Sequence, residues 1–187
     1  HDTLLVISLV VALFIQGSYL VNYTPIVSKE VPDSIADPAP ENRLTLLIAN
    51  VKMSNRTAQP LLDLIEKNNP DMVLVMEVDS WWEKALRPVA QEYAHRQEAF
   101  NDHTYGMTLY SRFELKDLKV ENLSHEKIPS FDCNVQLTNG KFFNLITVHP
   151  PPPTYFENIP DNEGKEEIAM TKVGEKVKRT KLPSVVA

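Results

Sequence analysis

Three short apolar runs in this chain each end on a polar residue, and they constrain the fold more than any other feature. They occupy residues 44–50, 71–77 and 142–149. Continuous apolar runs of this length are typical of strands covered on both faces. Open α/β sheets present ligand-binding groups at the carboxyl ends of their strands. We therefore expect the amide of Asn50, the carboxylate of Glu77 and the imidazole of His149 to lie close together.

The rest of the chain alternates between helical and strand-like patterns. Helices are predicted over residues 57–68, from 80 onward and over 162–181, and strands over 106–111, 113–121, 131–137, 141–148 and 182–187. We expect Thr57 to cap the first helix, a capping box to begin at Ser80, and Pro88 to interrupt the second helix. The Asn-Gly pair at 139–140 predicts a hairpin. Residues 106–149 therefore predict one antiparallel series of strands.

The composition narrows the functional classes. Hydrophobic residues make up 43% and charged residues 24%, as in a globular domain. The formal net charge is −6, and no basic stripe interleaved with aromatic residues is present. Strong non-specific attraction to nucleic acid is therefore not expected. The single Cys133 excludes an internal disulfide, and its strand-like surroundings favour a small buried hydrophobe.

The N-terminal segment is treated separately because residues 4–21 are apolar and uncharged. Their length matches the roughly 17–25 residues that cross a bilayer, so residues 1–26 predict a transmembrane helix. A buried core helix and a signal peptide are the alternatives, although a basic region and a small-residue cleavage site are missing. Residues 27–42 are rich in proline and acids and predict a semi-extended linker. The globular domain is then expected over 43–187.

Each of the three strand-end residues has a structural and a functional interpretation. Glu77 is either a solvated carboxylate or a ligand for a hard cation such as Mg²⁺. Asn50 is either a turn residue or an amide that orients Glu77 or contacts metal or phosphate. His149 is either satisfied by a backbone carbonyl or bonds a phosphate oxygen or acts in acid–base catalysis. The sequence contains no zinc-ligand spacing, phosphate-binding glycine loop or nucleophile-elbow serine.

Taken in order, four motifs resemble the endonuclease/exonuclease/phosphatase superfamily. They are LTLLIANVK, NNPDMVLVMEVDSWW, YGMTLYSR and FFNLITVHPPPP. The resemblance runs from about Arg43 to Ala187 and is closest to the membrane-anchored bacterial branch, in which hydrophobic helices precede the catalytic domain. It implies an α/β (α+β) fold, namely a four-layer α/β/β/α sandwich with mixed sheets. Here the sandwich would be partial and preceded by a hydrophobic N-terminal helix.

The resemblance also implies a phosphoester hydrolase that depends on Mg²⁺ or Mn²⁺. Glu77 would be the metal-coordinating carboxylate. Asn50 would be its active-site amide partner, with a place in both the metal site and catalysis. His149 would contact the scissile phosphate. A further family motif, interpreted as mainly structural, comprises Tyr105, Gly106, Ser111 and Arg112.

The chain departs from the family pattern after residues 182–187. Family members continue there with Gly-Asp-x-Asn and later an Asp-His pair, which bind phosphate, orient the attacking water and complete the acid–base apparatus. These motifs do not follow within the 187 residues. We therefore expect a truncated, N-terminal portion of an enzyme that is inactive as it stands. A shortened sandwich would expose a sheet edge, which favours a homo-oligomer.

Three hypotheses remain open. The first is the N-terminal portion of a metal-dependent phosphodiesterase or nuclease, anchored in a bacterial inner membrane on a side that the sequence does not fix. The second is a non-catalytic scaffold or interaction domain with the same fold. The third is a lipid phosphodiesterase of sphingomyelinase type. The expected partners are a phosphoester substrate, either nucleic acid or phospholipid, and the membrane through the N-terminal helix.

Overall fold

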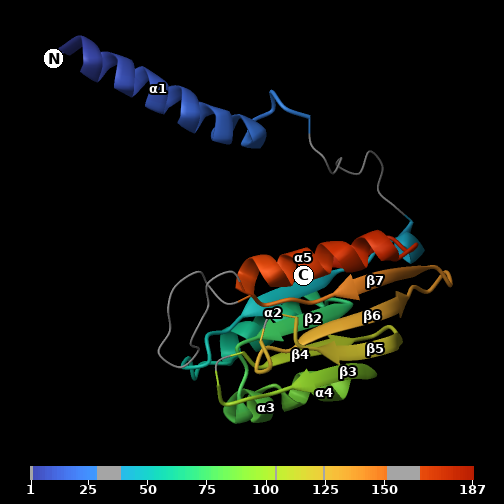
Figure 1. Cartoon of the computed structure of the whole chain (residues 1–187). Coiled ribbons are helices and arrows are strands. Elements are labelled where there is room, and N and C mark those ends of the chain that lie inside the picture. Colours follow the sequence, from blue (N-terminus) through green and yellow to red (C-terminus); the bar gives the residue numbers. More distant parts are fainter. Residues whose placement is uncertain (1, 29–38, 104, 124, 151–164) are drawn as a thin grey trace. The chain divides into compact units, whose positions relative to one another are not determined.

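The computed structural model describes residues 2–28, 39–103, 105–123, 125–150 and 165–187 (Figure 1). The chain divides into two compact units, His1–Pro38 and Ala39–Ala187. Residues 29–38 of the predicted linker and residues 162–164 of the predicted C-terminal helix lie outside the described residues.

The first unit contains the apolar helix that the sequence predicts. Helix α1 spans Asp2–Leu20, and a short 3₁₀ helix, η1, follows at Val21–Tyr23. Its segment Thr3–Leu20 has a mean hydropathy of 2.1 and is long and apolar enough to cross a membrane. A signal sequence or the core helix of a soluble protein would have the same length and composition.

The described residues of the second unit form two four-stranded sheets and five helical segments. Sheet A has the spatial order β1 (Leu46–Asn50), β2 (Met72–Met76), β4 (Met107–Ser111) and β3 (His95–Ala99). Sheet B has the order β5 (Leu115–Glu121), β6 (Ser130–Gln136), β7 (Phe142–Ile146) and β8 (Ser184–Val186). The helical segments are η2 (Pro40–Asn42), α2 (Gln59–Asn68), α3 (Ser80–Ala85), α4 (Arg87–Glu92) and α5 (Lys165–Arg179).

Both sheets are mixed. In sheet A, β1 and β2 are parallel and joined by α2, whereas β4 is antiparallel to both β2 and β3. In sheet B, β5, β6 and β7 are antiparallel neighbours and β8 runs parallel to β7. The register pairs Asn50 with Met76 and Met76 with Met107. The ends of β1 and β2 and the start of β4 therefore share one edge of sheet A, called here the carboxyl edge; the opposite one is the amino edge.

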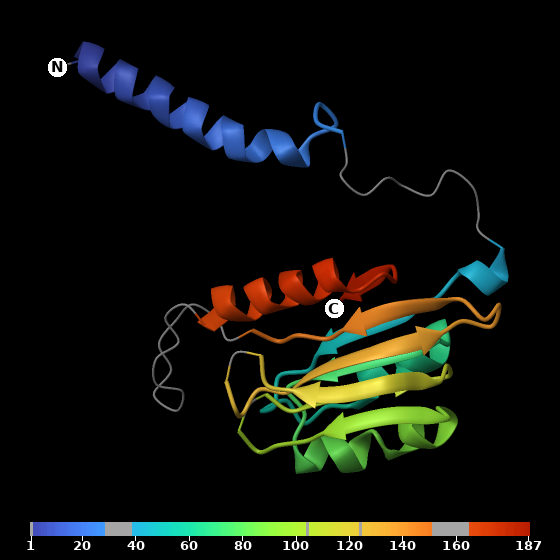
Figure 2. The ribbon, with the colours of Figure 1, turned by 45° about the vertical axis from the view of Figure 1, so that its right-hand side comes forward.

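The two sheets pack face to face, and helices cover both outer faces (Figures 1 and 2). Strand β2 shows why its sequence is continuously apolar: Met72 and Leu74 belong to the cluster between the sheets, and Val73 and Val75 to the cluster beneath the helices. Facing them across the sandwich are the buried side chains Phe131, Cys133, Val135, Phe143 and Leu145 of sheet B. This arrangement confirms the predicted α/β/β/α layers.

Helices pack on the two outer faces through different side chains. On sheet A the buried contacts come from α2, α3 and α4, through Leu61, Ile65, Trp82, Leu86 and Val89. On sheet B they come from α5, whose Ala169 and Val173 pack against Ile146 and Leu123. Helix α5 is also held by Lys176, whose Nζ lies 2.6 Å from Glu121 Oε2 and 2.7 Å from Asp132 Oδ2.

The strands between 106 and 149 do not form the predicted single antiparallel series. Strand β4 pairs with β2 and β3 in sheet A, whereas β5 pairs with β6 in sheet B. The chain therefore crosses between the sheets after Ser111. The predicted hairpin between β6 and β7 is confirmed, with Gly140 at a φ of 80°. Strand β3 was not predicted, because its sequence HRQEA lacks an apolar alternation and gains its hydrogen bonds from β4.

The caps of two helices also differ from the prediction. Helix α2 has Ala58 at its N-cap and no side-chain cap, so Thr57 does not cap it. Helix α3 begins at Ser80 as expected, but its cap is the preceding Asp79, which has an extended backbone. Pro88 interrupts the predicted second helix, which consists of α3 and α4.

Candidate active site

The turn that carries Glu77 is held by close backbone contacts. Glu77 follows β2 directly and has a φ of +62°, a left-handed conformation that costs a non-glycine residue about 1–3 kcal/mol. Val78 N donates to Gly106 O at 3.1 Å, and Asn101 N donates to Val78 O at 3.4 Å. A Cβ on Gly106 would lie 1.7 Å from Val78 O. Only glycine fits at this approach, so Gly106 has the structural role expected of it.

Asn50 is the last residue of β1, and both ends of its amide are engaged. Its Nδ2 donates to Glu77 Oε1 at 2.7 Å, and its Oδ1 accepts from the backbone N–H of Lys52 at 3.1 Å. These two bonds fix the orientation of the amide. In this arrangement Asn50 orients the Glu77 carboxylate, one of the functions considered for it from sequence.

His149 reaches the same place from sheet B. It lies beyond the end of β7, and its Nε2 is 3.8 Å from Glu77 Oε1. The His149 and Glu77 side chains are 15% and 19% exposed. Burial lowers the pKa of His149 below its usual 6.5, against the opposing effect of the Glu77 charge, so the ring is mainly neutral at pH 7. Within the described residues its buried Nδ1 has no hydrogen-bond partner.

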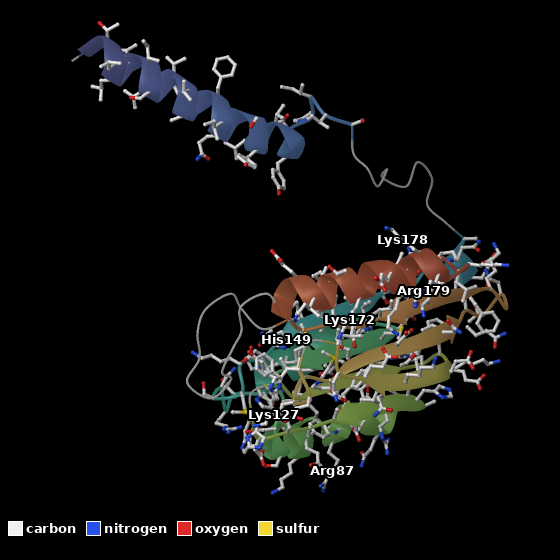
Figure 3. The ribbon with its side chains drawn as sticks, viewed as in Figure 1. Arg87, Lys127, His149, Lys172, Lys178 and Arg179 are labelled. Carbon is white, nitrogen blue, oxygen red and sulfur yellow. The ribbon has the colours of Figure 1, made fainter. Side chains whose placement is uncertain are left out.

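Tyr105 supports the His149 ring. The two ring centroids are 5.2 Å apart at an interplanar angle of 66°, an edge contact. Tyr105 is buried against Ile128. Burial, with the Glu77 charge as a second cause, raises the pKa of Tyr105, so it remains a neutral phenol. In Figure 3, His149 lies at one end of the domain, whereas Lys178 and Arg179 lie toward the other.

The remaining motif residues lie at the amino edge. Arg112 donates to Asn69 Oδ1 and lies over the Tyr93 ring, 5.2 Å from its centroid. Ser111 Oγ donates to Phe113 O at 2.8 Å and accepts from its N–H at 3.0 Å. These contacts are internal to the fold. They lie at the opposite end of the β2–β4 pair from Glu77, because Ser111 pairs with Met72.

The assembled site offers one carboxylate, one amide and one imidazole. Within the described ranges no group of three or more His, Cys, Asp or Glu side chains could hold a metal ion. A closed zinc site of four protein ligands is therefore not formed by these residues. Mg²⁺ differs, because proteins commonly bind it through one or two carboxylates while water and phosphate oxygens complete its shell. The donors present fit a hard cation of that kind.

Two residues that the sequence did not single out connect the loops of this site. Arg56 Nη1 donates to Asp79 Oδ1 at 2.9 Å, and its Nη2 lies 2.7 Å from Asp79 Oδ2. An Asp just before a helix is a recognisable cap signal. Nothing in the polar loop around Arg56 indicates its distant partner.

The comparisons with known proteins bear on the family and on the fold. The sequence model described as the Endonuclease/Exonuclease/phosphatase family matches residues 47–181. No curated protein matches the chain by sequence.

Several solved structures have a similar fold. TDP2 of D. rerio, complexed with single-strand DNA product, has 17% identity and a TM-score of 0.59, covering 76% of this chain and 58% of that one. The human Nocturnin catalytic domain with bound sulfate has 13% identity and a TM-score of 0.54, covering 81% and 68%. A 3′ phosphatase, NExo, from Neisseria, bound to a product DNA hairpin, has 18% identity and a TM-score of 0.52, covering 73% of this chain and 54% of that one. The chain thus spans less than two thirds of the TDP2 and NExo chains.

Proposed function

The chain belongs to the endonuclease/exonuclease/phosphatase family, and on that premise we propose that its carboxyl edge is the metal-binding side of a phosphoester hydrolase site. One observation carries the proposal. Glu77 Oε1 accepts a hydrogen bond from Asn50 at 2.7 Å and faces His149 Nε2 at 3.8 Å. These side chains lie at or beyond the ends of three different strands in two sheets, so only the folded sandwich brings them together.

Glu77 would hold Mg²⁺ or Mn²⁺, and Asn50 would keep its carboxylate in place. Members of this family typically use divalent metals. A bound cation of this kind supplies Lewis acidity that polarises a phosphoryl oxygen and stabilises charge on the leaving oxygen. The hydrogen bond from Asn50 limits rotation of Glu77, which pre-organises the carboxylate as a ligand.

His149 would bind the phosphate rather than the metal. A neutral imidazole carries one N–H donor. Because the pKa of His149 is lowered by burial, the ring can donate that hydrogen bond to a phosphate oxygen without adding a positive charge. Tyr105 holds the ring from one side through its edge contact.

The substrate class is proposed from the matched structures and from α1. TDP2 and NExo were solved with DNA products, which favours a phosphoester of nucleic acid. The apolar Thr3–Leu20 segment favours anchoring in a membrane and, as a second candidate, a phospholipid substrate. The net charge of −6 indicates that a nucleic-acid substrate would be held by local contacts more than by general attraction.

The test is Mg²⁺-dependent hydrolysis by the full chain in detergent. The substrates are a 3′-phosphorylated single-stranded DNA oligonucleotide, sphingomyelin in mixed micelles and bis(p-nitrophenyl) phosphate. Glu77→Ala should lower turnover by roughly 10³-fold, because a metal's charge stabilisation is worth several kcal/mol and each 1.4 kcal/mol is tenfold. Glu66→Ala, which removes an exposed carboxylate from α2, is the control. Turnover that survives Glu77→Ala, or needs no metal, contradicts the assignment. Mn²⁺ binding at Glu77 without hydrolysis of any substrate fits the inactive enzyme portion expected from the sequence, or a scaffold.

A further inference from the structure

The loops that follow β1 and β2 both begin with an uncommon backbone turn. Lys52 has a φ of +57° and Glu77 a φ of +62°. Few non-glycine residues adopt this region, and they remain there only when surrounding contacts hold them. Directly after β1, Val51 N donates to the carbonyl of Met76, the last residue of β2, at 3.1 Å. The Asn50–Glu77 hydrogen bond itself is exposed to solvent, so contacts farther along the loops decide how well it is held.

Arg56 and Asp79 supply such a contact between the two loops. The guanidinium meets both carboxylate oxygens, at 2.9 Å and 2.7 Å. Asp79 is only 5% exposed, and its Oδ1 also accepts from the backbone N–H groups of Trp81 and Trp82 at 3.1 and 3.0 Å. The Arg56 hydrogen bond is the main cause that lowers the pKa of Asp79 below its usual value. The carboxylate is therefore fixed to α3 on one side and to the first loop on the other.

Trp81 adds a second contact for the same guanidinium. The Arg56 Cζ atom lies 5.3 Å from the Trp81 ring centroid. A planar guanidinium can bind a carboxylate with two N–H groups and stack on an aromatic ring at once, which a lysine cannot. The first turn of α3 thus meets the loop after β1 through both a charged and an aromatic partner.

We propose that Arg56 and Asp79 are positioning residues for Glu77. Their pairing joins the loop after β1 to the loop after β2, and so keeps the Asn50 amide and the Glu77 carboxylate in register. The consequence for metal binding rests on the proposed function. If Asp79 were only a helix cap and Arg56 only a surface cation, the pair would affect Glu77 little, since exposed ion pairs contribute little.

The first arm of the test needs no metal. Hydrogen exchange is followed on the full chain for wild type, Arg56→Met and Arg87→Met. Arg87 is exposed on α4 and serves as the matched control (Figure 3). Arg56→Met should speed exchange at the Val51 and Val78 amides roughly tenfold and leave β2 amides unchanged, because only the loops lose a contact. Unchanged exchange at both amides overturns the proposal.

The second arm reports on Glu77 through Mn²⁺. The chain has two tryptophans, Trp81 and Trp82, so quenching of its emission by paramagnetic Mn²⁺ reports on the turn beside Glu77. Glu77→Ala should abolish saturable quenching. Arg56→Met should require 10–100-fold more Mn²⁺, the usual effect of losing a residue that supports a metal ligand, whereas Arg87→Met should match wild type. Wild-type Mn²⁺ affinity in Arg56→Met overturns the positioning role.

Asp79→Asn separates capping from pairing. Asn caps helices about as well as Asp but carries no charge. Asp79→Asn should therefore weaken Mn²⁺ binding as Arg56→Met does, and the double variant should be no worse than either, because one link is lost in each case. Additive losses contradict a shared link. If wild type shows no Glu77-dependent quenching, the proposed metal site fails, and the exchange arm still decides whether the pair holds the loops.

Discussion

The two edges of sheet A are formed by opposite ends of the same strands, yet their polar side chains are used differently. At the amino edge, Asp71 Oδ2 accepts from both N and Oγ1 of Thr45 at 2.7 Å. At the carboxyl edge, Glu77 accepts a hydrogen bond from Asn50, but His149 faces Glu77 at 3.8 Å without a hydrogen bond, and His149 Nδ1 has no partner among the described residues. Polar groups that bond internally stabilise the fold, whereas groups left available can bind a ligand.

One hollow lined by described residues lies away from the candidate site. A hollow of about 570 Å³ lies at the amino edge, lined in part by Asn69, Asp71 and Phe113. Nearby, Tyr93 O–H donates to Pro70 O at 2.8 Å, so the polar groups around it serve the fold. The available chemistry of the carboxyl edge is the better guide.

The largest loss of stability predicted from this comparison is that of Asp71→Ala at the amino edge. Asp71→Ala should lower the free energy of unfolding by about 2 kcal/mol, because it removes two hydrogen bonds to a partly exposed carboxylate. Urea denaturation measures this loss. Mn²⁺ binding at Glu77 should be unchanged, since Asp71 lies at the other end of β2. A loss of Mn²⁺ affinity with unchanged stability would reverse the roles assigned to the two edges.

A smaller effect, on Mn²⁺ affinity, is expected from replacing Asn50 at the carboxyl edge. Asn50→Ala should weaken Mn²⁺ affinity about tenfold, at the low end for a residue that supports a ligand, because Asn50 is exposed. Asn69→Gly is the matched control: Asn69 has a φ of +44° at the end of α2, which glycine adopts freely. Calorimetric titration of Mn²⁺ into both variants measures the difference. Equal losses of Mn²⁺ affinity in Asn50→Ala and Asn69→Gly would contradict the distinction between the two edges.

The smallest effect is the pH dependence that His149 confers on stability. Burial lowers its pKa in the folded state below the usual 6.5 of the unfolded chain. The unfolded state then binds the proton more readily, so stability is complete above pH 6.5 and is lost as pH falls through 6.5 toward the folded value. His149→Gln should remove this slope in urea midpoints measured between about pH 5 and pH 8. If His149→Gln keeps the same pH dependence of the urea midpoint, another titrating group is its cause.

Local sequence patterns predict many of the strands and helices. Strand β2 has the predicted apolar core Met72–Met76, because a strand buried on both faces must be apolar throughout. The sequence of β3 shows no such apolar pattern, because pairing with β4 makes it a strand despite its polar side chains. The switch of sheets after Ser111 is likewise a tertiary event that no local pattern indicates.

The site divides in the same way. Asn50 and Glu77 could be found because each ends an apolar run. Asp79 could have been found from its position before a helix. Arg56 could not, because its partner lies 23 positions away and its own loop shows no periodic pattern.

The most direct test of the central claim is calorimetric titration of Mn²⁺ into the 187-residue chain, comparing wild type, Glu77→Gln and Asp71→Ala. If the carboxyl edge is the ligand-binding edge, wild type and Asp71→Ala bind Mn²⁺ alike, and Glu77→Gln binds at least roughly 100-fold more weakly because it has lost the charged oxygen donor. Wild-type affinity in Glu77→Gln would show that the cation is not held at Glu77 and would contradict the account.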